Sequence, residues 1–87
     1  MEIQKQAQAG TLESSDVYVM ILPNENHEIA IQVKSIVIKQ FGEQIYQTAK
    51  DTLQRLGITS CILVLEDKGA LDYTIRARIE SAVERSL

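Results

Sequence analysis

The sequence predicts an α+β fold, a two-layer sandwich in which one small, mostly antiparallel sheet has two helices on one face. Two observations predict it. Apolar residues alternate with other residues in some segments, as in strands, and recur every three or four positions in others, as in helices. The predicted order is two or three strands, a helix, a strand and a helix. A length of 87 residues fits a single domain, residues 1–87, with one modest core.

The first half of the chain has the alternation of strands. A strand is predicted over residues 17–22, VYVMIL, because Val, Tyr and Ile suit a pleated surface. A second strand is predicted in EIAIQVK, residues 28–34, and we expect the two to pair as an antiparallel hairpin across the polar turn PNENHE. A weaker pattern over residues 7–12 predicts a shorter strand. The segment ESSD, residues 13–16, would then form the tip of a first hairpin.

The second half of the chain changes period. Apolar residues three or four positions apart predict an amphipathic helix over about residues 36–56, with Phe41 on its apolar face. Ser35 is the candidate N-cap, and Gly57 stands where a left-handed C-terminal cap is expected.

The last third of the chain predicts a buried strand and a second helix. The uncharged block of residues 61–65 predicts a strand that is buried on both faces near the middle of the sheet. From Ala70 onward, helical spacing of apolar residues predicts a helix that runs to the end of the sequence.

Composition excludes several classes of protein. A net charge of -3 and a pI near 5.0 argue against a nucleic-acid-binding surface, which needs clustered Lys and Arg. A single cysteine excludes an internal disulfide, and MEIQKQAQAG at the start lacks the apolar core of a signal peptide, so we expect a cytoplasmic protein. No apolar run approaches the roughly 20 residues of a membrane-spanning helix.

Residues that could carry catalysis or bind a metal are sparse. His27 is the only histidine and lies in a polar turn, where we expect it to be solvated. Cys61 lies in the apolar block, where we expect it to pack in the core. No HxH, CxxC or HExxH spacing occurs, so no metal site is predicted. Gly69 alone does not make a phosphate-binding loop.

Charged residues of the second helix allow two interpretations. Asp72, Arg76 and Glu80 are spaced four apart and would form ion pairs along the exposed helix face, each stabilising it by about 0.2–0.5 kcal/mol. Alternatively, Lys68, Arg76 and Arg78 are candidates for partner docking or phosphate contacts. Spacing alone does not decide between them.

Two motifs resemble a known family. GTLESSD, residues 10–16, and DKGALDYTIRAR, residues 67–78, closely resemble segments of the citrate lyase acyl carrier protein, the gamma subunit, and the resemblance extends over nearly the whole chain. It implies that Ser14 is the covalent attachment point of a 2'-(5''-phosphoribosyl)-3'-dephospho-coenzyme A group, joined through a phosphodiester, with Ser15 as its neighbour in the turn. From the residues alone, both serines are comparable acceptors.

The resemblance also implies a mechanism and a set of partners. The terminal thiol of the group would hold an acetyl thioester. The alpha subunit, an acyl transferase, would exchange acetyl for citryl and release acetate. The beta subunit, a citryl lyase, would release oxaloacetate and regenerate the acetyl form. A prosthetic-group transferase would modify the serine, and the carrier itself would be non-catalytic.

Three alternatives remain at the level of the sequence. The carrier subunit of malonate decarboxylase uses the same type of prosthetic group. An unmodified interaction or regulatory module would use the ESSD segment only as a turn. A stand-alone hydrolase with Ser14 or Ser15 as nucleophile would need His27 as its base.

Overall fold

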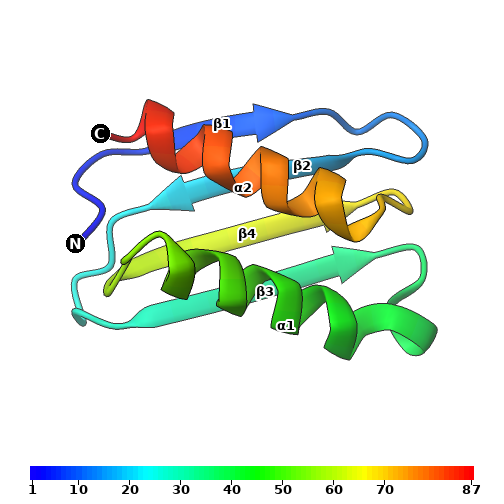
Figure 1. The fold of residues 1–87 in the computed structure, drawn as a ribbon, viewed down its shortest axis with the longest axis horizontal. Coiled ribbons are helices and arrows are strands. Elements are labelled where there is room, and N and C mark those ends of the chain that lie inside the picture. Colours follow the sequence, from blue (N-terminus) through cyan, green and yellow to red (C-terminus); the bar gives the residue numbers. More distant parts are fainter.

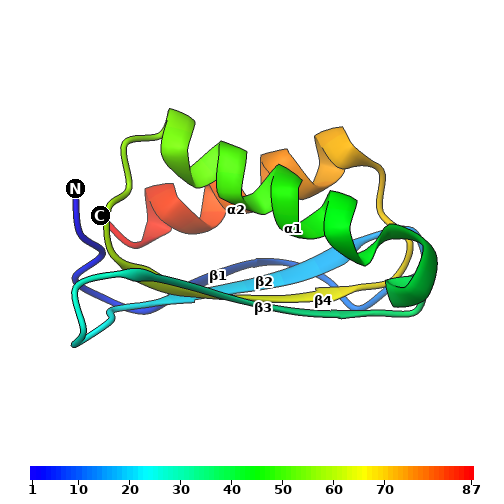
Figure 2. The same ribbon diagram turned by 90° about the horizontal axis from the view of Figure 1, so that it is seen from below.

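Four strands form one mixed sheet, and two helices pack against one of its faces (Figures 1 and 2). The computed structural model describes residues 1–87. In chain order the elements are β1 (Ala7–Gly10), β2 (Val17–Leu22), β3 (Ile29–Ser35), α1 (Ile38–Arg55), β4 (Cys61–Asp67) and α2 (Asp72–Arg85). The predicted α+β class and its two layers are confirmed.

The order of strands across the sheet differs from the predicted hairpin. It is β1-β2-β4-β3, so β2 and β3 do not pair and the prediction of a β2–β3 hairpin is wrong. β4 lies between them, antiparallel to β2 and parallel to β3. Helix α1 provides the crossover that a parallel pair requires, and the arrangement gives the most apolar strand two neighbours. Since β1–β2 and β2–β4 are antiparallel, the sheet is mostly antiparallel, as predicted.

The core fills the space between the sheet and the helices. Alternate residues of the two central strands face the helices and are completely buried: Val17, Val19, Ile21, Cys61, Leu63 and Leu65. Burial raises the pKa of the Cys61 thiol to about 11, which agrees with its predicted place in the core. The central position of β4 is confirmed, but its other face, with Ile62 and Val64, is only half-buried because no second layer covers it.

Of the two predictions for the ends of α1, the one for its start is wrong and the one for its end is confirmed. Helix α1 begins at Ile38 and Ser35 is not its N-cap, because the Ser35 hydroxyl donates to the Asp67 carboxylate at 2.7 Å and accepts from the Val37 N–H. Gly57 does terminate the helix, with a φ of 74° that an L side chain rarely adopts.

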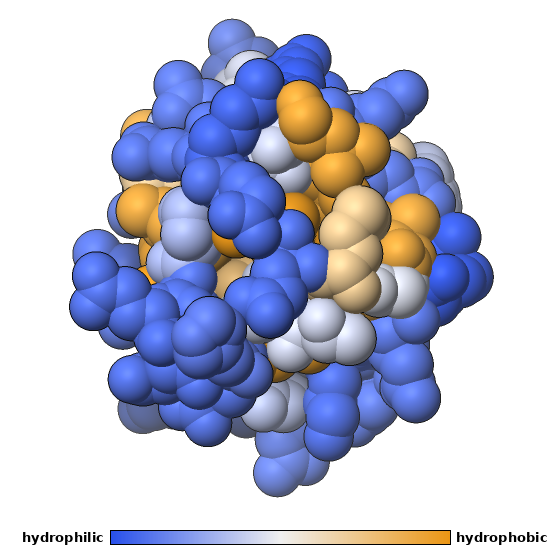
Figure 3. Space-filling view, turned by 90° about the vertical axis from the view of Figure 1, so that its left-hand side faces the viewer, coloured by the Kyte–Doolittle hydropathy of each residue, from blue (hydrophilic) through white to orange (hydrophobic).

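The two ends of the molecule carry different segments. At one end lie residues 11–16, the link from β3 to α1 and the link from β4 to α2 (Figure 1). At the other end lie both termini and the turn of residues 23–28. Figure 3 shows this second end, where hydrophilic side chains surround a small apolar group, and Met1, Leu56, Val83 and Leu87 line a hollow there. Neither helix has the length and apolar composition needed to cross a membrane.

Candidate functional site

Ser14 lies in the turn that joins β1 to β2, and its side chain is exposed. The side-chain hydrogen bonds of this turn are made by Thr11 and Asp16 and do not involve the Ser14 hydroxyl. The Ser14 oxygen is therefore free to react with an incoming group, and the neighbouring Ser15 hydroxyl is likewise exposed.

Backbone contacts hold the turn against the segment that follows β4. The Ser15 N–H donates to the Lys68 carbonyl at 2.8 Å, and the Lys68 N–H donates to the Asp16 carbonyl at 2.9 Å. Ser15 has a φ of 66°, so the chain reverses sharply directly after Ser14. A side chain at Gly10 would clash with the Val17 carbonyl, since a Cβ there would lie 1.9 Å from that oxygen. The turn is thus fixed on both sides of Ser14.

An ion pair between Asp16 and Arg78 joins the turn to α2. Arg78 Nε and Nη2 donate to the two carboxylate oxygens of Asp16 at 3.0 and 2.9 Å, and Thr11 and the Val17 N–H each donate at 2.7 Å. The hydrogen bond from Arg78 lowers the pKa of Asp16 to about 2; the bonds from Thr11 and Val17 also lower it, while partial burial opposes the shift. The ion pair anchors the turn of residues 11–16, which we call the serine turn, to α2, although its two residues are 62 positions apart in sequence.

The pKa of Asp16 makes the stability of the turn dependent on pH. Because the pKa falls from 3.8 to about 2 on folding, the ionised carboxylate stabilises the fold above about pH 4, and this stabilisation is lost as the pH falls toward 2. We expect Asp16→Asn to lower the Tm by several degrees at pH 7, and the difference from wild type to shrink toward pH 2. Thermal melts followed by circular dichroism measure it.

Asp51→Asn is the matched control for that comparison. Asp51 is exposed and accepts only from Gln47 of its own helix, so its replacement should leave the pH dependence of the Tm unchanged. An Asp16→Asn deficit of the same size at every pH would contradict the assigned role of the carboxylate.

A buried carboxylate, Asp67, fixes the segment that supports the turn. Its side chain is 1% exposed and accepts from the Ser35 hydroxyl and from the N–H groups of Gly69 and Ala70, at 2.7, 3.1 and 2.9 Å. These bonds shape residues 68–70, and Lys68 in turn holds Ser15. Asp67 thereby links the end of the sheet to the serine turn.

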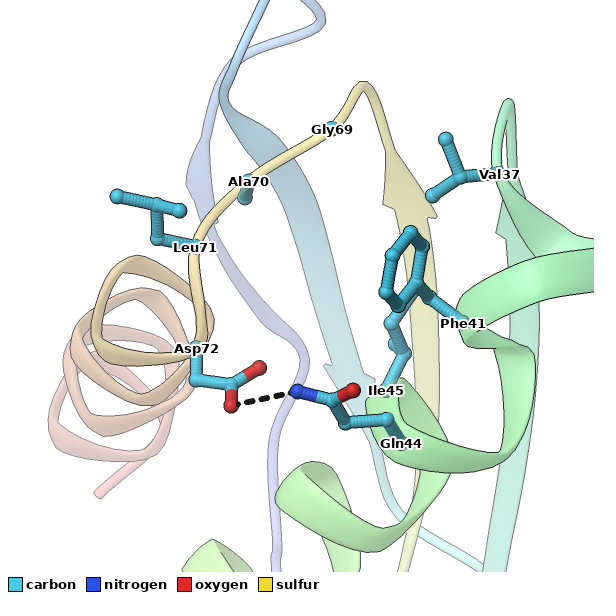
Figure 4. Close-up of a pocket in the computed structure, with 8 residues that line it drawn as sticks. All are labelled: Val37, Phe41, Gln44, Ile45, Gly69, Ala70, Leu71 and Asp72. Atoms are coloured by element: carbon cyan, nitrogen blue, oxygen red, sulfur yellow. Dashed lines mark hydrogen bonds between the residues drawn. The ribbon is translucent and has the colours of Figure 1, made fainter.

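A pocket of about 290 Å³ lies between the start of α1 and the segment that leads into α2 (Figure 4). It is lined by Val37, Phe41, Gln44, Ile45, Gly69, Ala70, Leu71 and Asp72. The Gln44 amide donates to the Asp72 carboxylate at 2.9 Å. Phe41 faces across the pocket toward the residue 69–70 segment, whereas Leu71 points away from it. Phe41 lines the pocket together with Ile45, so it lies on the predicted apolar face of α1, but it is 50% exposed.

The charged residues of α2 make contacts that the sequence did not predict. Asp72 pairs with Gln44, and Glu80 pairs with Arg55 of α1 at 2.7 Å, so the predicted pairs with Arg76 are not formed. Helix α1 packs beside α2 and supplies nearer partners. Of the three candidate basic residues, Lys68 contacts the serine turn through its backbone, Arg78 contacts it through its guanidinium group, and Arg76 is exposed on α2.

His27 lies at the other end of the sheet from Ser14. Its side chain is 74% exposed, as expected for a turn residue, and its Nδ1 atom lies 2.9 Å from a Glu2 carboxylate oxygen. The six residues of β2 separate the two turns by roughly 20 Å. The hydrolase interpretation, which needs His27 as the base for a serine nucleophile, is therefore wrong. No cluster of three or more His, Cys, Asp or Glu side chains is arranged to hold a metal ion.

Comparison with known proteins places the chain in a family. The citrate lyase acyl carrier protein of Clostridium perfringens (strain 13 / Type A) is 51% identical over 86 residues, which are 99% of this chain and 85% of that protein. Those of Pectobacterium atrosepticum and Haemophilus influenzae are 48% and 49% identical, over 99% of this chain and 88% of theirs. The chain belongs to the citrate lyase acyl carrier protein family. Membership in an acyl carrier family implies a covalently attached prosthetic group, and the predicted resemblance of the chain to this family is confirmed.

Two further matches connect the acyl carrier family to malonate decarboxylase. A family model described as malonate decarboxylase delta subunit (MdcD) matches residues 4–86. A chain from the crystal structure of a Pseudomonas malonate decarboxylase hetero-tetramer in complex with malonate has the same fold, with a TM-score of 0.78 and 20% sequence identity. The superposition covers 100% of this chain and 89% of that one. The likeness between these two chains shows a shared fold.

Proposed function

We propose that this chain is the acyl carrier subunit of citrate lyase and that Ser14 carries phosphoribosyl dephospho-coenzyme A through a phosphodiester. The observation that carries the proposal is the exposed Ser14 hydroxyl, free of partners in a rigid turn, in a chain 51% identical to a citrate lyase acyl carrier protein. A modifying transferase needs access to that oxygen, and a swinging arm needs a fixed base.

The surroundings of Ser14 fit a phosphodiester. The backbone of Lys68 is hydrogen-bonded to Ser15 and Asp16 of the turn. Arg78 donates to Asp16 through Nε and Nη2 only, so its Nη1 is available to another acceptor. We assign these two cations to phosphate contacts, because ammonium and guanidinium groups bind phosphate oxygens strongly. Arg76, exposed on the same helix as Arg78, is assigned to docking with a partner subunit.

The protein itself positions the acyl group and provides no reactive thiol. When bound, the prosthetic group supplies the thiol that holds the acyl residue. Cys61 does not compete with it, because burial in β4 raises its pKa to about 11. The turn fixes the starting point of the arm, so each partner active site meets the acyl group at the high effective concentration of a tethered reactant. The carrier is non-catalytic in this proposal.

The proposed partners follow from the carrier role. They are the alpha subunit, as acyl transferase, the beta subunit, as citryl lyase, and the transferase that loads Ser14, all in the cytoplasm. A fold shared with a chain of a hetero-tetrameric decarboxylase supports assembly into a multi-subunit enzyme.

Malonate decarboxylase is the second candidate. The family model over residues 4–86 bears the name of its delta subunit, which favours this alternative. Relatives that are 48–51% identical over 99% of the chain are named for citrate lyase. These matches favour the citrate lyase carrier over the malonate decarboxylase carrier. The two candidates share Ser14 and its prosthetic group and differ in the partner subunits.

Mass spectrometry of the protein purified from citrate-fermenting cells tests the proposal. We expect the intact mass to exceed that of the sequence by one phosphoribosyl dephospho-coenzyme A, and the peptide that contains Ser14 to carry the addition. Subunits that co-purify then distinguish citrate lyase from malonate decarboxylase. An unmodified chain from such cells would instead favour the interaction module.

A further inference from the structure

The pocket between α1 and the β4–α2 link is adjacent to the serine turn. The Ser15 N–H binds the Lys68 carbonyl, and Gly69 and Ala70, the next residues, form one side of the pocket. Figure 4 shows this segment as one rim of the pocket and Phe41 of α1 as the facing wall. A group attached to Ser14 therefore starts beside the rim.

The pocket presents a mixed apolar and polar surface. Val37, Phe41 and Ile45 give it apolar walls, and half of the Phe41 surface is open to solvent although the residue is aromatic. At one side, Gln44 donates an N–H to Asp72 Oδ2. This bond leaves the Gln44 carbonyl oxygen and Asp72 Oδ1 as two neighbouring acceptors. A flat apolar molecule that bears an amino group matches this set.

We infer that this pocket binds the adenine base of the group attached to Ser14, an inference that rests on the proposed function. Adenine is a flat aromatic ring that stacks on an aromatic side chain, and its exocyclic amino group supplies two donors for the acceptors of Gln44 and Asp72. The volume of about 290 Å³ is near the lower end of small-molecule pockets, as suits a base rather than a whole coenzyme.

The connectivity of the prosthetic group selects adenine over its other parts. Only one phosphoribosyl unit separates the serine from the adenosine ribose, so the base is the first apolar part of the group within reach of the rim. The pantetheine chain leaves the adenosine from another position of the ribose. Binding of the base therefore leaves the thiol arm free and shortens the portion that moves.

Nuclear magnetic resonance of the loaded protein tests the inference. Isotope-labelled chain is co-expressed with its transferase, and intact mass verifies the group on Ser14. We expect nuclear Overhauser effects between the adenine protons and the protons of Phe41 and Ala70, with adenine shifts displaced from those of free dephospho-coenzyme A.

Two variants on one helix provide the comparison. Phe41→Ala should lower the ratio of bound to free adenine about tenfold, the factor expected for the loss of one stacking partner. Tyr46→Ala is the matched control, because Tyr46 is an exposed aromatic residue of α1 that does not line this pocket, and it should leave the contacts unchanged.

The outcomes separate the two proposals. A loaded wild-type chain whose adenine has the shifts of free dephospho-coenzyme A and no contacts to Phe41 would overturn the inference and leave the carrier function intact. Equal loss of contacts in both variants would also overturn it. A chain that never acquires the group would overturn the carrier function, and the inference with it.

Discussion

Ser14→Ala is expected to abolish loading completely and to leave the fold intact. The exposed hydroxyl makes no intramolecular hydrogen bond, so its removal should change the free energy of unfolding by no more than about 0.5 kcal/mol. Without the oxygen, no phosphodiester forms at this position. Intact mass after co-expression with the transferase measures loading, and citrate cleavage by a complex reconstituted with the variant measures function.

Ser15→Gly is the matched variant for the neighbouring hydroxyl. Ser15 has a φ of 66°, a conformation that glycine adopts freely, so the change preserves the turn and its bond to Lys68 while it removes the second oxygen. We expect normal loading. Loading of Ser14→Ala together with failure of Ser15→Gly would move the attachment to Ser15, and citrate cleavage by Ser14→Ala would refute the assignment of Ser14.

Among the residues that hold the serine turn in place, Asp67 is the one whose replacement by Ala is expected to cause the largest loss of stability. The change leaves three half-buried donors, the Ser35 hydroxyl and the N–H groups of Gly69 and Ala70, without their common acceptor. Each unpaired donor costs about 1–3 kcal/mol, so the three together cost about 3 kcal/mol or more. For a domain of this size each kcal/mol lowers the Tm by roughly 4–8 °C, so thermal melts should show a decrease of about 12 °C or more.

Glu66→Ala is the control for Asp67→Ala. Glu66 is adjacent in β4 but points to the open face of the sheet, where it pairs with Lys34 at 3.7 Å. A surface pair of this kind contributes little, so the Tm should change by no more than a few degrees. Equal effects of the two substitutions would show that the Asp67 hydrogen bonds do not hold the β4–α2 link.

The predictable part of the fold was the part encoded by local periodicity. Residues 17–22 alternate because one face of β2 is buried, and residues 38–55 repeat at helical spacing because one face of α1 is buried. These patterns were sufficient to predict each element and the number of layers. They do not predict which strands pair, since β2 and β3 are neighbours in sequence but are separated in space by β4.

The candidate site was predictable only where a motif marks it. Ser14 is proposed because the motif that contains it resembles a family, and the structure adds why its turn is rigid. The carboxylate of Asp16 meets Arg78 across 62 positions of sequence, and nothing in the spacing of either residue indicates the other. Asp67 was also missed, because a carboxylate near a polar turn is ordinarily solvated, whereas here it is buried by contacts from distant segments.

The opposite placement of the termini and Ser14 has a practical consequence for biosensors and immobilised enzymes. The domain is 30 Å long, with Ser14 at one end and both termini at the other. The amino group of Met1 donates to the Gly57 carbonyl at 2.7 Å, whereas Leu87 is 65% exposed. A surface linker or fluorescent fusion is therefore best joined after Leu87, where it disturbs no hydrogen bond of the Met1 amino group and leaves the end with the β1–β2 turn facing the solution.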